Sequence, residues 1–224
     1  MFRQRKCGGE HCLSMGTMDA TDLRNELQKI QQDTWAHYDF RTKFATFMHH
    51  HDTQTPIQST HKNTQTIPLY WLSFKWQRDE PIIIYRFMEF SSLFPWIQRL
   101  YDRLIENGMK KGVVVKAMFA ALLPHQKISP HIDNGDALRM SHRYHWVITT
   151  TPSVHIKVNN IEFHMPTDSI YELNNLFLHS VDNPSDDIRI HFIMDVLPNE
   201  SITTSISYED IDREKYKQIE YTLY

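Results

Sequence analysis

The sequence contains little glycine, little cysteine and no long hydrophobic run. Its 224 residues include only 6 glycines, 10 prolines and 2 cysteines. This composition excludes a collagen-like or low-complexity chain, and the 41% of hydrophobic residues is enough to form a core. The longest apolar runs, such as residues 118–123, are far shorter than the roughly 18 residues that cross a membrane as a helix. We therefore expect a folded globular protein with no membrane partner.

The chain also lacks an excess of charge of either sign. Its formal net charge is -3 at pH 7, whereas proteins that bind a nucleic-acid backbone normally carry a basic face. Cys7 and Cys12 would suit a metal knuckle or a small disulfide loop, but no second pair of zinc ligands is near them. We interpret them as reduced cysteines of an N-terminal tail without an apolar secretory segment. These features predict a cytoplasmic protein with no nucleic-acid partner.

The length predicts one large domain after a short tail. We assign residues 1–18 to a flexible tail and residues 19–224 to a single domain. The expected secondary structure changes twice within this domain. Residues 19–111 form a support region of helices and strands, residues 112–198 form a β-rich core, and residues 199–224 form a C-terminal extension.

The sequence predicts helices near both ends of the domain. Apolar residues recur at helical spacing in residues 19–38 and again in residues 91–107. Ser207 and Asp210 form a capping-box pattern, which predicts a short closing helix over residues 207–219.

The middle of the chain has the pattern of short antiparallel strands. Apolar and polar residues alternate in several segments, so each strand has one buried face and one wet face. Asn159 and Asn160 suit the positive φ of a tight hairpin turn. The class is α+β, mainly β, with a double-stranded β-helix (jelly roll) as the core. The expected strands are residues 67–76, 81–85, 112–123, 142–150, 154–158, 161–165, 169–173, 177–181 and 188–196.

Histidine is abundant, with 14 residues, and three side chains suggest a metal site. His131 and Asp133 are two positions apart on an extended segment, so their side chains point to the same face. His179 lies beyond the predicted hairpin and is the candidate third ligand. Two imidazoles and one carboxylate form the facial triad of non-haem Fe(II) oxygenases.

Arg189 is the candidate partner for an anionic ligand. If the strands on either side of Pro184 pair, Arg189 lies opposite His179 and points to the metal side. A buried guanidinium needs a planar anion, and a ligand carboxylate fits its fork. The alternative is a structural ion pair of Arg189 with Asp186 or Asp187.

A second basic residue comes from the strand at residues 142–150. Arg143, His145, Val147 and Thr149 share one face of this strand. We expect Arg143 and His145 to project beside the metal ligands. A dicarboxylate could then bind Arg189 at one end and Arg143 near the other. The alternative for His145 is a core histidine with satisfied hydrogen bonds.

Five motifs that contain these residues resemble the aspartyl/asparaginyl β-hydroxylase family, over about residues 65–198. The resemblance implies a jelly-roll dioxygenase that uses Fe(II), 2-oxoglutarate and O2, with ascorbate as an addition in vitro. The motifs occur in the family's order: Ile128-Ser129-Pro130-His131-Ile132-Asp133, Arg143-Tyr144-His145, Tyr171-Glu172-Leu173-Asn174-Asn175, His179-Ser180-Val181-Asp182-Asn183 and Arg189-Ile190-His191-Phe192-Ile193-Met194-Asp195.

The resemblance also implies roles for individual residues. Asp133 has no counterpart in the animal peptidyl hydroxylases and resembles the metal carboxylate of the bacterial amino-acid hydroxylases. Ala120 replaces a serine that helps to hold oxoglutarate in the animal enzymes, and Pro124-His125 replaces the usual Pro-Gly. The implied roles are metal ligation by His131 and His179, oxoglutarate binding by Arg189 and Arg143, and contacts to oxoglutarate from His145 and from an aromatic residue, Trp76 or Trp71.

The predicted activity is hydroxylation of an amino-acid side chain, either in a small free amino acid or in a polypeptide. Asp195 and His191 share the face of Arg189 and are expected to hydrogen-bond the site residues. The polar segment 49–66 is expected to close over the substrate. The alternatives are a cupin-like protein that binds a metal or a small acid without turnover, and a jelly-roll metal isomerase or lyase.

Overall fold

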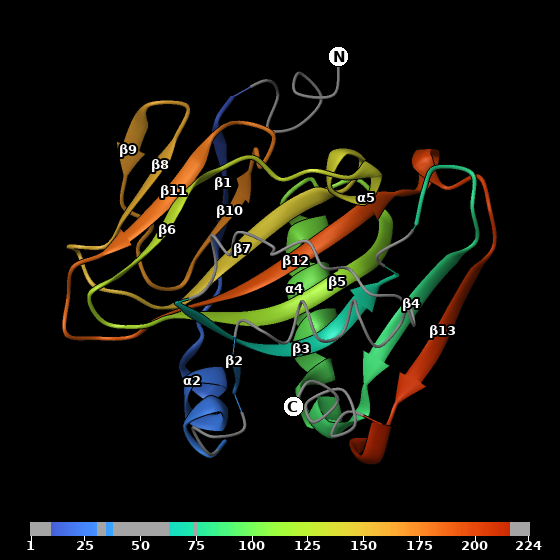
Figure 1. Ribbon diagram of the computed structural model, residues 1–224, viewed down its shortest axis with the longest axis horizontal. Coiled ribbons are helices and arrows are strands. Elements are labelled where there is room, and N and C mark those ends of the chain that lie inside the picture. The colour runs from blue at the N-terminus through green and yellow to red at the C-terminus, as the bar shows by residue number, and fades with distance from the viewer. Residues whose placement is uncertain (1–9, 31–34, 38–62, 74–75, 216–224) are drawn as a thin grey trace, which may run out of the picture.

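The structure, a computed structural model, describes residues 10–30, 35–37, 63–73 and 76–215. Its strands form two sheets that enclose a common interior (Figure 1). The larger sheet contains β1 (Cys12–Thr17), β10 (Ser169–Leu173), β7 (His142–Thr149), β12 (Arg189–Pro198), β5 (Gly112–Leu122), β3 (Thr64–Leu72), β4 (Ile82–Phe87) and β13 (Ile206–Ile211), in this order, with β2 (Ala36–His37) beside β3. The smaller sheet contains β6 (Gln126–His131), β11 (His179–Asn183), β8 (His155–Val158) and β9 (Ile161–Phe163).

The centre of this arrangement is the predicted jelly roll. Strands β10, β7, β12 and β5 pair antiparallel in the larger sheet, and β6, β11, β8 and β9 pair antiparallel in the smaller sheet. The alternation on β7 is as predicted, because Tyr144, Trp146 and Ile148 belong to the core on one side of the larger sheet. Val147 instead packs between the two sheets, with Ile156 of β8. Arg143 and His145 share the inner face with Val147, which directs them to the interior of the roll.

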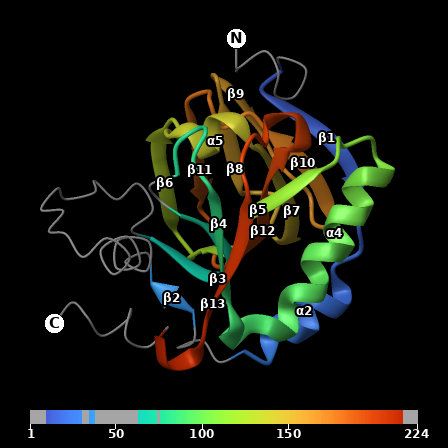
Figure 2. The same cartoon turned by 90° about the vertical axis from the view of Figure 1, so that its right-hand side faces the viewer.

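Helices cover the outer face of the larger sheet (Figure 2). The longest, α4 (Phe94–Glu106), has a proline in its first turn and buries Trp96, Ile97, Leu100 and Leu104, as its apolar spacing predicts. Trp96 packs on Trp146 of β7, with ring centroids 5.9 Å apart. The other helices are α2 (Thr21–Gln28), α5 (Asp136–Met140) and the 3-10 helices η3 (Met88–Leu93) and η4 (Asn199–Ser201).

The predicted C-terminal helix at residues 207–219 is wrong in its first part. Residues 206–211 form β13, which pairs in parallel with β4, and a helical turn begins only at Arg213. Asp210 forms an ion pair with Arg86 of β4 instead of a capping box, at 2.6 Å. The edge of β4 offers backbone groups that need partners, and pairing with them outweighs a local capping preference.

The N-terminal segment also differs from its prediction. Within the expected tail, β1 pairs with β10, and Cys12 lies opposite Leu173. Cys12 is a free cysteine, and burial, followed by the charge of Glu172, raises the pKa of its thiol to about 12. Helix α2 is shorter than the predicted helix at residues 19–38. Cys7 and residues 49–62 of the expected substrate-covering segment lie outside the described residues, and residues 64–66 belong to β3.

Two turns of the jelly roll contain residues other than glycine whose φ is positive, in the left-handed region of the backbone. Asn159 and Asn160, with φ of 47° and 67°, form the predicted turn between β8 and β9. Between β5 and β6, His125 has φ of 56° and occupies the position of the glycine expected from the resemblance. Its Nε2 lies 2.9 Å from Oδ1 of Asp186. The bend that leads into the first metal-ligand motif is therefore made without glycine.

Candidate metal centre

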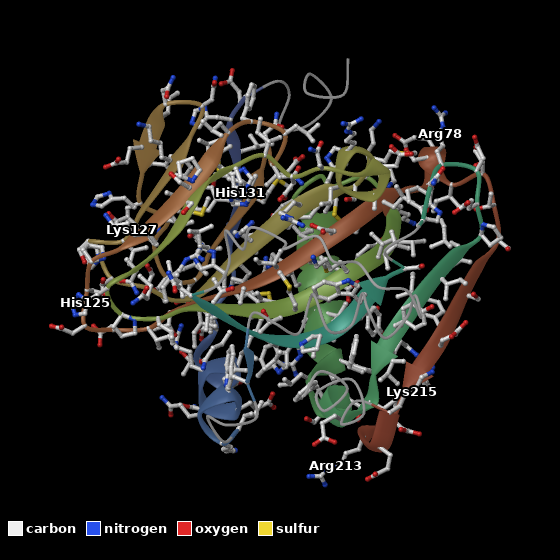
Figure 3. All side chains as sticks on the ribbon, viewed as in Figure 1. Arg78, His125, Lys127, His131, Arg213 and Lys215 are labelled. Atoms are coloured by element: carbon white, nitrogen blue, oxygen red, sulfur yellow. The ribbon has the colours of Figure 1, made fainter. Side chains whose placement is uncertain are left out.

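Two histidines from neighbouring strands of the smaller sheet face each other. His131 ends β6 and His179 begins β11, and their ring centroids are 4.2 Å apart. Nδ1 of each ring lies within 2.9 Å of a backbone carbonyl oxygen two residues earlier, on Ser129 and on Phe177. A carbonyl only accepts hydrogen bonds, so each Nδ1 carries a proton, and in the neutral ring the lone pair is then on Nε2. Figure 3 shows His131 well inside the outline of the molecule and His125 at its edge.

Asp133 completes the group. The potential ligand atoms of His131, Asp133 and His179 all lie within 4.8 Å of one another. Oδ2 of Asp133 accepts hydrogen bonds from Nη1 of Arg143 and, at 3.0 Å, from Nδ2 of Asn175. Burial alone would raise the pKa of Asp133, but the positive charge of Arg143 and the nearby His179 hold it well below its usual range. The carboxylate is therefore ionised, and its Oδ1 lies on the side of Nε2 of His131.

Burial favours the metal-binding form of His179. Burial lowers the pKa of His179 below its usual value, which favours the neutral ring. Oδ1 of Asp133 lies 3.8 Å from Nε2 of His131, too far for a hydrogen bond between them. The structure brings these three side chains together from two strands and the loop after β6, and their role as metal ligands stays a prediction.

The predicted strand pairing around Pro184 is wrong. β11 pairs with β6 and β8 in the smaller sheet, whereas β12 pairs with β5 and β7 in the larger sheet. The connection between β11 and β12 therefore crosses from one sheet to the other. Asn183 holds the crossing, because its Nδ2 donates to the carbonyls of Leu122, Leu123 and Asp187. Arg189 reaches the cavity of His179 from the facing sheet, and does not lie opposite it within one sheet.

Arg143 is enclosed by carboxylates. Its Nε and Nη2 each donate to Asp195 of β12 at 2.8 Å, and Nη1 donates to Asp133. Burial alone would lower the pKa of Arg143, but Asp133 and Asp195 together raise it. The resemblance predicts that this arginine binds oxoglutarate. In the structure its guanidinium connects Asp133 to the larger sheet, so its charge is already balanced by protein groups.

Arg189 has the opposite surroundings. It is 3% exposed, its Nη2 donates to Nδ1 of His191 at 2.8 Å, and its buried Nε has no hydrogen-bond partner in the described part of the chain. Within the described residues it forms no ion pair with a carboxylate, and Asp186, one alternative partner, contacts His125 instead. Burial lowers the pKa of Arg189 to about 9. A buried cation with an unused donor is a site for an anion.

Two further histidines lie beside Arg189. Nδ1 of His145 is 3.2 Å from Nδ1 of His191, and both rings are buried. Burial, and then the positive charge of Arg189, lowers the pKa of both histidines well below the usual value, so both are neutral. Nε2 of His145 is buried without a hydrogen-bond partner among the described residues. This excludes the reading of His145 as a core histidine with satisfied hydrogen bonds.

These polar groups line one cavity between the sheets. His131, His179, Arg143, His145 and Arg189 all contribute to its surface. Apolar side chains form the remaining wall, among them Met118, Ala120, Ile156, Leu173 and Val181. A metal at the triad and an anion at Arg189 would therefore share one cavity with a largely apolar wall.

A sequence model of the family described as Aspartyl/Asparaginyl beta-hydroxylase matches residues 19–198. This match includes all the residues of the cavity. The chain belongs to the aspartyl/asparaginyl β-hydroxylase family. No curated protein matches the chain.

Solved structures resemble this β-hydroxylase family member only distantly. An oxidoreductase of the 2OG-Fe(II) oxygenase family from Burkholderia pseudomallei has 9% identity and a TM-score of 0.44, covering 62% of this chain and 70% of its own. The plu4264 protein from Photorhabdus luminescens has 12% identity and a TM-score of 0.37, covering 77% and 88%. A Cupin 2 conserved barrel domain protein from Salinispora arenicola CNS-205 has 11% identity and a TM-score of 0.29, covering 36% and 61%. At such scores, membership of the family rests on the sequence match alone.

Trp76 does not reach the cavity of this family member. It packs in a separate cluster with Leu72 and Ile82, and its Nε1 donates to the carbonyl of Glu80 at 3.0 Å. Trp71 is likewise absent from the cavity wall. The aromatic contact expected from the resemblance is not supplied by either tryptophan.

Asn175 also belongs to the site, although no pattern in the sequence predicts a role for it. Besides the hydrogen bond from its side chain to Asp133, its carbonyl accepts the backbone N–H of Asp133 at 3.1 Å. Asn175 is fully buried in the loop between β10 and β11. Its contacts are between residues far apart in the chain, so only its place in a family motif could have drawn attention to it.

No described helix is long and apolar enough to span a membrane.

Proposed function

We propose that the protein is an Fe(II)- and 2-oxoglutarate-dependent dioxygenase that hydroxylates an amino-acid side chain. The observation that carries the proposal is the combination of a two-histidine, one-carboxylate group with a buried, unbalanced arginine in the same cavity. A metal alone would leave Arg189 without an anion. An anion alone would leave three converging ligand atoms without a cation.

The ligand set fits Fe(II). Two neutral imidazole nitrogens and one ionised carboxylate occupy one face of a metal and leave other positions open for small ligands. The hydrogen bonds from Nδ1 of His131 and His179 to backbone carbonyls fix both rings with Nε2 toward the metal. Asn175 and Arg143 hold the other oxygen of Asp133, which orients the carboxylate.

The anion site fits the distal carboxylate of 2-oxoglutarate. The free Nε–H of Arg189 is a donor in a dry pocket, where a charge-assisted hydrogen bond is strong. The charge of Arg143, in contrast, is already balanced by Asp133 and Asp195. We therefore assign oxoglutarate binding to Arg189 and assign to Arg143 the task of holding the metal carboxylate.

Bound Fe(II) and oxoglutarate would supply the O2 chemistry that places one oxygen atom in a substrate C–H bond. The residues of this chain contribute binding, orientation and exclusion of water. His131, Asp133 and His179 hold the metal, Arg189 fixes the direction of the cosubstrate, and the apolar wall keeps the reacting groups dry. The substrate side chain belongs to a small amino acid or a polypeptide.

The test is to load the full chain with Fe(II) and oxoglutarate, and to measure succinate while candidate substrates are analysed by mass spectrometry. Ascorbate is added to keep the iron reduced. Replacing His179 with Ala is expected to abolish tight metal binding and turnover, because two ligands do not retain the metal. The matched control is His155→Ala, which removes a half-exposed histidine from the neighbouring strand β8 and should bind metal normally.

Each outcome has a distinct meaning. Unchanged metal stoichiometry in His179→Ala would overturn the metal assignment. Succinate formed with a free amino acid would identify the substrate class as free, and a gain of one oxygen by a peptide alone would identify it as peptidyl. Binding of both metal and oxoglutarate without oxidation of either substrate class would favour the non-catalytic cupin-like binding protein.

A further inference from the structure

His191 occupies a central position between the groups that would face a ligand. It lies on β12 two residues after Arg189, so both side chains point to the same face of the larger sheet. Its cross-strand neighbour on β5 is Ala120, whose side chain is only a methyl group. The small side chain at Ala120 leaves room for an imidazole on this face, and His191 is 1% exposed there.

The contacts of His191 fix its protonation state. Nη2 of Arg189 can only donate a hydrogen bond, and it lies 2.8 Å from Nδ1 of His191. This nitrogen is therefore the one with the lone pair, and the proton of the neutral ring is on Nε2. Among the described residues, His191 is the one hydrogen-bond partner of the Arg189 side chain. It therefore restrains the guanidinium, whose remaining N–H groups stay available to the cavity.

The same nitrogen determines the tautomer of His145. Nδ1 of His145 is 3.2 Å from Nδ1 of His191, and two lone pairs would repel each other at this distance. Nδ1 of His145 must therefore carry its proton, which leaves a lone pair on its unpaired Nε2. A carboxylate also only accepts, so it binds the donors of Arg189 and not Nε2 of His145. Nε2 of His145 can therefore accept a hydrogen bond from a donor such as water or a hydroxyl group of a ligand.

We propose that His191 is a positioning residue, which holds Arg189 for the distal carboxylate of the cosubstrate and sets His145 as an acceptor. This inference rests on the proposed function, because it assigns a role within the same cosubstrate site. It predicts that His191 controls how strongly the site prefers a ligand with a distal carboxylate. A residue that only fills space would affect all ligands of the cavity equally.

The experiment compares two probes on the full chain loaded with Mn(II), which binds as Fe(II) does without turnover. One probe is 2-oxoglutarate, and the other is 2-oxopentanoate, which has the same 2-oxo acid but no distal carboxylate. Calorimetry measures the dissociation constant of each, and their ratio is the selectivity. His191→Leu removes the hydrogen-bond acceptor, because it replaces the imidazole with an apolar side chain of similar size. We expect its selectivity to fall by roughly tenfold to a hundredfold, with binding of 2-oxopentanoate and Mn(II) almost unchanged.

Two polar variants provide matched controls. The side-chain oxygen of Asn lies near the position of Nδ1, so His191→Asn should retain most of the selectivity. The oxygen of Gln lies farther out, so His191→Gln should lose selectivity although it is equally polar. This pair tests the proposal even if His191→Leu does not fold.

The outcomes separate this inference from the proposed function. Wild-type protein that does not prefer oxoglutarate would contradict the cosubstrate assignment itself. Strong preference in the wild type that persists in His191→Leu, or is equal in His191→Asn and His191→Gln, would overturn the role of His191 alone. Equal weakening of both probes in His191→Leu would identify a packing residue and also overturn it.

Discussion

Arg143 and Arg189 both line one cavity, but the groups around them differ in charge. Both are buried, at 8% and 3% exposure. Arg143 contacts two carboxylates, which raise its pKa, whereas Arg189 contacts a neutral histidine, and burial lowers its pKa to about 9. A buried cation that the protein neutralises is part of the framework. A buried cation that it leaves unbalanced lowers the stability of the ligand-free state and is available to an anionic ligand.

The largest effect is expected for Arg143→Met, which leaves Asp133 and Asp195 buried without their cation. The free energy of unfolding of the metal-free protein should fall by about 3–5 kcal/mol, as for other broken buried pairs. Denaturant titration measures this change. The control Arg103→Met removes an exposed pair with Glu106 on α4 and should cost about 0.5 kcal/mol or less. If the two variants lose similar stability, the carboxylates around Arg143 do not depend on it.

The second largest effect is expected for Arg189→Met, whose change in the free energy of unfolding has the opposite sign. Arg189→Met replaces an unbalanced buried charge with an apolar side chain, so the free energy of unfolding should stay equal or rise by about 1–3 kcal/mol. Metal binding should persist, while the affinity for oxoglutarate falls by a large factor. Calorimetry and the same denaturant titration check both parts. A marked loss of stability in this variant would mean that protein groups balance Arg189, and would remove the distinction between the two arginines.

The smallest expected effect is on how the free energy of unfolding changes at acidic pH. Arg143 holds the pKa values of Asp133 and Asp195 below those of the unfolded chain, against the effect of burial. Carboxyl groups with lowered pKa contribute stability that is present above the unfolded pKa of about 3.9 and is lost as pH falls below it. In Arg143→Met, burial should instead raise these pKa values, so its stability should increase on acidification from neutral pH toward pH 4. Parallel pH curves of unfolding free energy for wild type and variant would contradict this prediction.

The site was predictable from the sequence wherever its geometry is local. His131 and Asp133 share a face because side chains alternate along extended backbone, and the same rule put Arg143 beside His145. Asn159 and Asn160 made a turn because both residues tolerate positive φ. These features depend on the conformation of a few successive residues, so a linear pattern contains them.

Pairing between distant strands was not predictable in the same way. The turn residues around Pro184 are compatible with a hairpin, but β11 pairs with β6 and β8 while β12 pairs with β5 and β7. Asn183 stabilises the crossing between the sheets through the carbonyls of Leu122 on β5 and Leu123 after it. Likewise, Ser207 and Asp210 have the pattern of a helix cap, and the exposed edge of β4 decides that they form a strand. Backbone groups far away in the chain provide the competing hydrogen bonds.

The sequence by itself indicated the mainly β class, the three candidate metal ligands and the presence of basic residues on the interior face. Only the tertiary structure decided which of the two arginines is available to a ligand. Arg143 and Arg189 are equivalent in sequence, since both occupy inward positions on apolar strands. Their difference arises because Asp195 and Asp133 converge on Arg143 from β12 and from the loop after β6, whereas no described carboxylate reaches Arg189. Charge balance in a buried cavity depends on distances of a few ångströms, and these are set by packing of the two sheets.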